Sequence, residues 1–265
     1  MRRVALYSTF LALAAGCLDL APTTVAAAPP PPEVCAKCLE PYDPTQWERS
    51  VAFGFNLARG NTDTALININ AKAQREFESN IYRFELDGNY GEDKDKERAG
   101  GDKKTQENVK GLAEYKRLLS DRFYVGIGGA YLYDDISAID YRVTINPVAG
   151  YFLLKDDEVK LSVEAGPSYI FEEVNNESDD YLAPRAAERF EYVISKTSKI
   201  FQSAEVLIDV DDSDNYIVNS EAGIKAAINS NLSLVVSAKD SYDNQPAVDR
   251  EKNDLAVISA LQFSL

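Results

Sequence analysis

Between Trp47 and Leu265 the sequence repeatedly alternates apolar and polar residues in short segments, with turn residues between them. In the first segment Val51, Phe53 and Phe55 share one face. A period of two residues places successive side chains on opposite faces of a β-strand, whereas a helix needs a period of about 3.6. Twelve such segments lie at about 47–59, 64–77, 81–91, 105–117, 122–134, 141–154, 159–172, 181–195, 199–210, 215–229, 232–242 and 252–265. We therefore predict an all-β fold, an antiparallel up-and-down barrel of about 12 strands.

The connections between these segments differ in length on the two sides of the predicted barrel. Those after the even-numbered segments are short, whereas those after segments 3, 7 and 11 are longer and charged, at 92–104, 175–180 and 243–251. Outer-membrane barrels have short periplasmic turns and longer outer loops. An even number of strands also brings both ends of the barrel to the same, periplasmic side. The alternation is weak at 64–77, 105–117 and 181–195, so the boundaries there are less well defined.

The more polar face of the segments carries many ionisable residues. They are Arg83, Glu85, Asp87, Glu114, Arg142, Glu164, Arg185, Arg189, Glu205, Glu221, Lys225 and Lys239. A soluble barrel would point them outward, and alternation alone does not say which face is inside. Aromatic residues lie near the segment ends, as in the girdles of membrane barrels. They are Tyr90, Tyr131, Tyr133, Tyr151, Tyr169 and Phe171. We therefore predict that the apolar face contacts outer-membrane lipid, which makes this a transmembrane barrel.

Residues 1–27 have the pattern of a secretory signal peptide. A positive start at Arg2 and Arg3 precedes an apolar run over residues 4–15, which is too short to cross a membrane as a helix. A cleavage pattern of small residues follows and ends at Ala27. We expect cleavage there, export, a proline-rich periplasmic leader over residues 28–46 and a barrel over residues 47–265.

Three cysteines precede the barrel. Cys17 ends a sequence similar to a lipoprotein cleavage motif, so its lipidation is an alternative to cleavage after Ala27. Cys35 and Cys38 form a C-x-x-C pair. No βαβ pattern surrounds the pair, Leu39 stands where haem attachment needs histidine, and a zinc site would need two more ligands. We expect a local disulfide in an oxidising compartment, and a tether to another periplasmic component is the alternative.

Composition excludes several classes of function. The formal net charge is -15, so the chain lacks the basic surface that nucleic-acid binding requires. It contains no histidine, which removes Ser-His-Asp catalysis and the commonest ligand of zinc and copper. We predict that the chain is not an enzyme and has no cofactor or metal site.

Two acidic clusters invite a calcium hypothesis. Asp209, Asp211, Asp212 and Asp214 form one, and Asp134, Asp135 and Asp140 form the other. Closely spaced oxygen ligands suit calcium, but the glycine and glutamate that complete a helical calcium loop are missing. We interpret both clusters as solvated hairpin ends.

Several short motifs recur in a known order over residues 50–265. They are Gly60-Asn61-Thr62-Asp63, Tyr133-Asp134-Asp135, Asp140-Tyr141-Arg142, Gly150-Tyr151, Glu164-Ala165-Gly166-Pro167 and Asn219-Ser220-Glu221-Ala222-Gly223. In these motifs the chain resembles the salt-induced outer-membrane proteins, a bacterial family of unknown function. The resemblance implies an outer-membrane barrel and brings no catalytic residues. The ending Phe263-Ser264-Leu265 departs from the terminal phenylalanine that is common in such barrels, yet it keeps the alternation, so we expect recognition by the barrel-insertion machinery.

Three functional hypotheses follow. The first is a barrel with envelope or salt-stress duties and a polar, charged lumen. The second is a narrow channel for ions or small polar solutes, because twelve strands lie between a filled barrel and an open pore. The third is a soluble exported β-domain that binds a ligand. For the first two we predict that the lumen is lined by Arg83, Glu85, Glu164, Arg185, Arg189 and Glu221.

Overall fold

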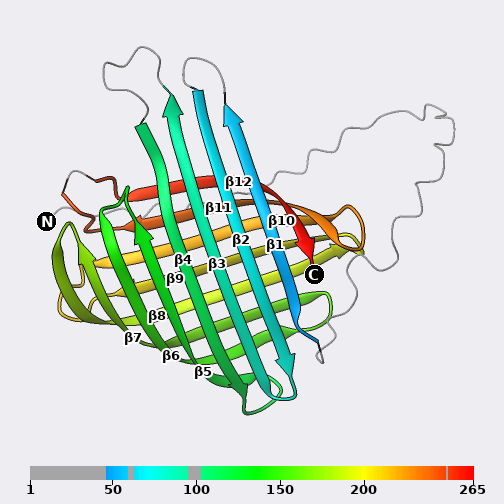
Figure 1. Cartoon of the computed structure of the whole chain (residues 1–265). Coiled ribbons are helices and arrows are strands. Elements are labelled where there is room, and N and C mark those ends of the chain that lie inside the picture. The colour runs from blue at the N-terminus through cyan, green and yellow to red at the C-terminus, as the bar shows by residue number, and fades with distance from the viewer. Residues whose placement is uncertain (1–45, 59–62, 95–102, 249) are drawn as a thin grey trace, which may run out of the picture. The chain divides into compact units, whose positions relative to one another are not determined.

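The computed structural model describes residues 46–58, 63–94, 103–248 and 250–265, which form a closed barrel of twelve antiparallel strands (Figure 1). Each strand pairs with the next along the chain, and the last pairs with the first. The strands are β1 (Glu48–Ala58), β2 (Asp63–Phe77), β3 (Asn80–Lys94), β4 (Lys103–Leu118), β5 (Phe123–Asp134), β6 (Ile139–Lys155), β7 (Val159–Val174), β8 (Glu177–Ser195), β9 (Ser198–Ile208), β10 (Tyr216–Ala227), β11 (Leu232–Asp243) and β12 (Asn253–Ser264). The predicted fold class and strand number are confirmed.

The strands are strongly tilted, so that β1–β4 cross the strands behind them steeply in Figure 1. Twelve strands about 4.8 Å apart and tilted by about 40° enclose a backbone cylinder roughly 25 Å in diameter. Inward side chains occupy much of that width, so any free passage through this barrel is narrow.

The outside of the barrel is apolar and the inside is polar. Phe55, Leu86 and Ile127 are more than half exposed on the outer face, whereas Asn68 and Asp87 are buried inside. This distribution is the reverse of a soluble barrel and matches a protein whose outer solvent is hydrocarbon. The predicted orientation of the two faces is confirmed, and the soluble β-domain hypothesis is not supported.

One predicted loop is wrong. The connection after β7 is a two-residue turn, Asn175-Asn176, and not a charged loop over 175–180, because β8 already begins at Glu177. Both asparagines have positive φ, 54° and 62°. Such a turn suits a tight hairpin, and asparagine tolerates left-handed backbone better than most residues. Residues 177–180 therefore extend the β7–β8 ladder outward from the membrane.

An aromatic ring packs over a glycine inside the barrel. Tyr124 on β5 is opposite Gly150 on β6, and it is 1% exposed. A Cβ added at Gly150 would lie 2.3 Å from the Tyr124 ring, so only glycine leaves room for it. Tyr124 in this way fills lumen space beside inward positions that have no side chain.

No helix in the described part of the chain is long and apolar enough to cross a membrane. The predicted signal peptide at residues 1–27, the leader up to residue 45, and Cys17, Cys35 and Cys38 lie outside the described residues.

Candidate functional site

Ion pairs between distant strands cross the interior of the barrel. Lys239 on β11 lies 2.9 Å from Asp87 on β3, and Arg142 on β6 lies 3.2 Å from Asp243 on β11. These strands are four and five places apart in the closed sheet, so their side chains can meet only through the lumen. The lumen is therefore the candidate functional site.

Eight charged side chains form a chain of alternating sign around the inner wall, from β2 to β9. In order they are Lys72, Glu85, Arg83, Glu114, Lys116, Glu164, Arg185 and Glu205. We call this set the alternating belt. Successive members are separated by nitrogen–oxygen distances between 2.5 and 3.6 Å. Its four cations and four carboxylates balance, so the belt as a whole is neutral.

Strand register explains most of the belt. Lys72 is the cross-strand partner of Glu85, and Arg83 is the partner of Glu114, so each pair shares the inner face. Cross-strand neighbours of opposite charge are mutually stabilising.

The belt passes from Lys116 on β4 directly to Glu164 on β7, without a charged member on β5 or β6. The inward positions Gly126 and Gly150 carry no side chain there. Tyr124 fills the space, and its hydroxyl donates a hydrogen bond to Glu164 at 2.9 Å. The arrangement holds the Glu164 carboxylate between two cations and a phenol.

The end of the lumen opposite the two barrel termini, which we call the outer mouth, is bridged across its width by Arg142. Arg142 pairs with Glu172 on the neighbouring strand and reaches Asp243 on the far side. Next to this bridge, the Ser137 hydroxyl lies 3.3 Å from the Asp254 carboxylate. Below the bridge is a cluster of buried inward side chains, Ile170, Tyr181, Ala183, Leu207 and Ile217. The outer half of the lumen is therefore narrow and partly apolar on the β7–β10 side.

A cavity of about 160 Å³ occupies the lumen toward the end that holds both barrel termini. Its lining residues come from β1–β3 and β8–β12. Six described basic side chains and four carboxylates line it. They are Lys72, Arg83, Arg189, Lys199, Lys225 and Lys239, and Glu48, Asp87, Glu191 and Glu221. We call it the basic cavity, because cations outnumber carboxylates in a chain whose net charge is -15.

The cavity differs from the belt in charge pairing. Among the described residues, Arg189, Lys225 and Glu221 have no ion-pair partner within 4.0 Å. Charged groups without a partner in a protein interior are costly unless water reaches them. We therefore expect water in the basic cavity.

The residues predicted to line the lumen fall into two groups. Arg83, Glu85, Glu164 and Arg185 belong to the alternating belt. Arg189 and Glu221 border the basic cavity, which Arg83 also lines.

Sequence reasoning missed Lys72, Lys116, Glu191 and Lys199. Lys72 follows Asn68 and Asn70 at every second position of β2, which is a usable polar signal. Lys116 was harder to place, because small outward residues of β4, Gly111 and Ala113, weaken the contrast between its faces.

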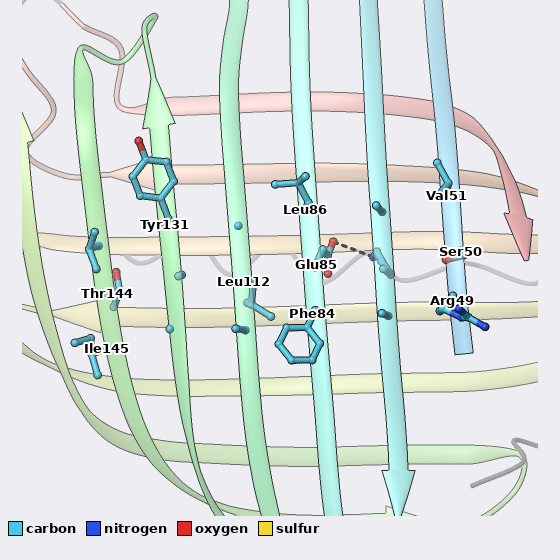
Figure 2. Close-up of a pocket in the computed structure, with 18 of the residues that line it drawn as sticks. Arg49, Ser50, Val51, Phe84, Glu85, Leu86, Leu112, Tyr131, Thr144 and Ile145 are labelled. Carbon is cyan, nitrogen blue, oxygen red and sulfur yellow. Dashed lines mark ion pairs between the residues drawn. The ribbon is translucent and has the colours of Figure 1, made fainter. Parts of the chain in front are cut away.

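A second hollow lies on the outside of the barrel (Figure 2). It is an apolar groove of about 770 Å³ across β1–β6, with a floor of small residues that includes Ala71, Ala73 and Gly111. Phe84 and Tyr131 are among the lining residues labelled in Figure 2. Because it opens on the lipid-facing surface, this groove belongs to the membrane contact and not to a path for polar solutes.

The acidic hairpin end at Asp209 is organised by its own hydrogen bonds. The Asp209 carboxylate accepts from the backbone N–H of Asp211 at 2.8 Å and from the Asn215 amide at 3.2 Å. Among the described residues, no group of three or more histidine, cysteine, aspartate or glutamate side chains is arranged to hold a metal ion.

The model of a family described as "Protein of unknown function, DUF481" matches residues 51–264. No curated protein matches the chain significantly. Similar solved structures include the NanC porin, with a TM-score of 0.49, 8% identity and coverage of 82% of this chain and 97% of that one. The COG4313 outer-membrane channel from Pseudomonas putida F1 has a TM-score of 0.49, 10% identity and coverage of 83% and 95%. The KdgM porin has a TM-score of 0.44, 12% identity and coverage of 82% and 99%.

Proposed function

This chain belongs to the DUF481 family, whose function is not established, and we propose that it is a bacterial outer-membrane barrel that conducts small ions and polar solutes through a narrow charged lumen. In this proposal the six predicted lumen residues line the conducting path. Four of them form part of the neutral belt, and Arg189 and Glu221 face the basic cavity.

The observation that carries the proposal is that charged side chains are paired in the alternating belt, whereas several in the basic cavity have no ion-pair partner among the described residues. A barrel that served only as a scaffold would gain most from a fully paired or apolar interior, because unpaired charges cost free energy away from water. Arg189, Lys225 and Glu221 line a cavity and have no ion-pair partner among the described residues. Because such groups need water around them, their position favours a water-filled path that starts at the end of the barrel that holds both termini.

The outer mouth sets the width of this path. The Arg142 bridge and the apolar cluster below it narrow the lumen, and apolar constrictions oppose ion passage because water leaves them readily. We therefore expect a low conductance in the wild-type protein, limited at the outer mouth and not at the basic cavity.

Single-channel recording of the refolded full chain in planar bilayers tests the proposal. We expect small, discrete currents for the wild type and a several-fold larger conductance for Arg142→Ala, because the bridge to Asp243 is lost. Glu188→Ala, on the outer face of β8, serves as the control and should leave the conductance unchanged. Absence of current in both the wild type and Arg142→Ala would refute the channel.

The second candidate function is a barrel with envelope or salt-stress duties and no transport. The ion pairs that cross the lumen, Lys239–Asp87 and Arg142–Asp243, favour it because they tie opposite walls together. This candidate predicts a folded, heat-modifiable membrane protein that carries no current in any mouth variant.

Both candidates require export and insertion. We propose that residues 1–27 direct secretion, that Cys35 and Cys38 form a disulfide in the periplasmic leader, and that the barrel-insertion machinery reads the last strand. Mass spectrometry of the membrane-extracted protein tests the first two points, since it gives the first mature residue and the redox state of the two thiols. It also detects any lipid on Cys17.

A further inference from the structure

Two lysines face each other inside the basic cavity. Lys199 on β9 and Lys225 on β10 are direct cross-strand partners, so their side chains leave the same inner face at the same level. Like charges directly opposite each other destabilise a sheet. The pair thus creates a local excess of positive charge at the terminal end of the lumen.

The surrounding carboxylates do not neutralise this excess. Lys199 lies 3.1 Å from Glu191, whereas Lys225 has no ion-pair partner among the described residues. Lys72 also repels Lys225, whereas Glu48 and Glu191 attract it. Lys72 is held by Glu85 at 3.0 Å, and the Glu48 carboxylate accepts a hydrogen bond from Gln74 at 2.6 Å. The Lys225 ammonium group is therefore available to bind an anion.

The same cavity supplies further donors. Arg189 also lacks an ion-pair partner among the described side chains, and it borders the cavity at the level of Ser203 and Glu221, farther from the terminal end than Lys225. Ser203, Ser237 and Gln262 add neutral polar groups to the lining. A volume of about 160 Å³ suits a small anion with a few waters and is too small for an oligomer.

We propose that Lys199 and Lys225 form a binding site for a small oxyanion, with Arg189 as the next cation along the lumen. An oxyanion placed between the two ammonium groups turns their repulsion into two charge-assisted hydrogen bonds. This inference rests on the proposed function in one respect only: in a conducting barrel, the site makes the lumen prefer anions. Binding itself does not require conduction.

The experiment measures inorganic phosphate binding to the purified, folded full chain in detergent, independently of current. The readout is the temperature at which the fast-migrating folded band converts to the slow unfolded band, titrated with phosphate against chloride at constant ionic strength. A ligand that binds only the folded barrel raises this temperature. We expect a phosphate-dependent rise in the wild type and an about tenfold or greater loss of apparent affinity in Lys225→Gln, which removes a charged donor.

Three variants make the result specific. Lys225→Arg keeps the charge and should retain most of the phosphate effect. Arg189→Gln should weaken binding less than Lys225→Gln. Lys196→Gln removes an equal charge from the β8–β9 turn at the same end of the barrel and should bind like the wild type. Folding of each variant is verified by its fast-migrating band, so loss of binding is separated from loss of structure.

The outcomes separate the site from the channel. Phosphate stabilisation that depends on Lys225, with no current in bilayers, supports the site and refutes the channel. Currents without a phosphate effect refute the site and support the channel. Equal phosphate stabilisation of the wild type, Lys225→Gln and Lys196→Gln overturns the proposed site.

Discussion

The alternating belt and the basic cavity use the same residue types in opposite ways. In the belt every cation pairs with at least one carboxylate, and Glu164 contacts Lys116, Arg185 and Tyr124 at once. In the cavity Lys225 faces another lysine and has no described ion-pair partner. A paired charge holds the wall of the barrel together, whereas an unpaired, hydrated charge is free to meet a ligand. The contrast separates a charge network that stabilises the wall from a cavity for which we propose ligand binding.

The largest expected effect concerns the centre of the belt. Glu164→Ala leaves Lys116 and Arg185 as buried cations without their shared partner, and we expect a loss of about 3–5 kcal/mol in the free energy of unfolding. Denaturant titration of the barrel in lipid vesicles measures it. Glu188→Ala, which removes a carboxylate from the outer face of the same wall, is the control. Equal stability of the two variants would mean that the belt does not stabilise the barrel.

The packing of Tyr124 against Gly150 gives a further loss of stability. In Gly150→Ala the new methyl group would clash with the Tyr124 ring at 2.3 Å, and we expect a loss of about 1–3 kcal/mol in the same unfolding measurement. Gly128→Ala is the matched control, because its added Cβ has no contact closer than 3.7 Å. The loss of unfolding free energy caused by Gly150→Ala should be smaller when Tyr124 is also replaced by alanine. An equal loss in both backgrounds would mean that it comes from the backbone at Gly150 and not from the clash with the Tyr124 ring.

Two matched lysine variants test the belt and the basic cavity with the same substitution. Lys116→Gln removes a cation that lies 2.5 Å from Glu164 and should cost a few kcal/mol of unfolding free energy. Lys225→Gln should change it by no more than about 0.5 kcal/mol, or raise it, because the repulsion by Lys199 is relieved. Similar losses in both variants would contradict this separation of the belt from the basic cavity.

The smallest effect is expected outside the lumen. Lys104 pairs with Glu107 and lies 3.7 Å from Asp135 at the outer end of β4, with its side chain 49% exposed. Exposed pairs contribute little because water and salt screen them. Lys104→Ala should leave the unfolding free energy close to that of the wild type, as measured by denaturant titration. A larger loss would show that ion pairs beyond the membrane also hold the barrel.

Much of this fold could be predicted from the period of the sequence. Alternation located all twelve strands, because a strand between lipid and a polar lumen must change polarity at every residue. The turn at Asn175-Asn176 was predictable in principle, since two asparagines tolerate the left-handed conformation that a tight hairpin needs. Strongly charged flanking residues suggested a loop instead.

The pairing inside the lumen was not predictable from the sequence. Which charges meet depends on barrel closure and strand tilt, which bring Lys116 on β4 to Glu164 on β7 across two strands. The sequence distributes cations and carboxylates over the polar face without showing which remain unpaired. Lys199 and Lys225 are 26 positions apart, and only the β9–β10 register makes them neighbours.

The most direct test of the account is the reversal potential of the wild type and of Lys225→Glu, measured in a planar bilayer under a tenfold potassium chloride gradient. We predict a wild-type reversal potential displaced toward that of chloride and a displacement toward that of potassium in Lys225→Glu. A cation preference in the wild type, identical potentials in the two proteins, or no current even after Arg142→Ala would contradict a conducting lumen governed by the basic cavity.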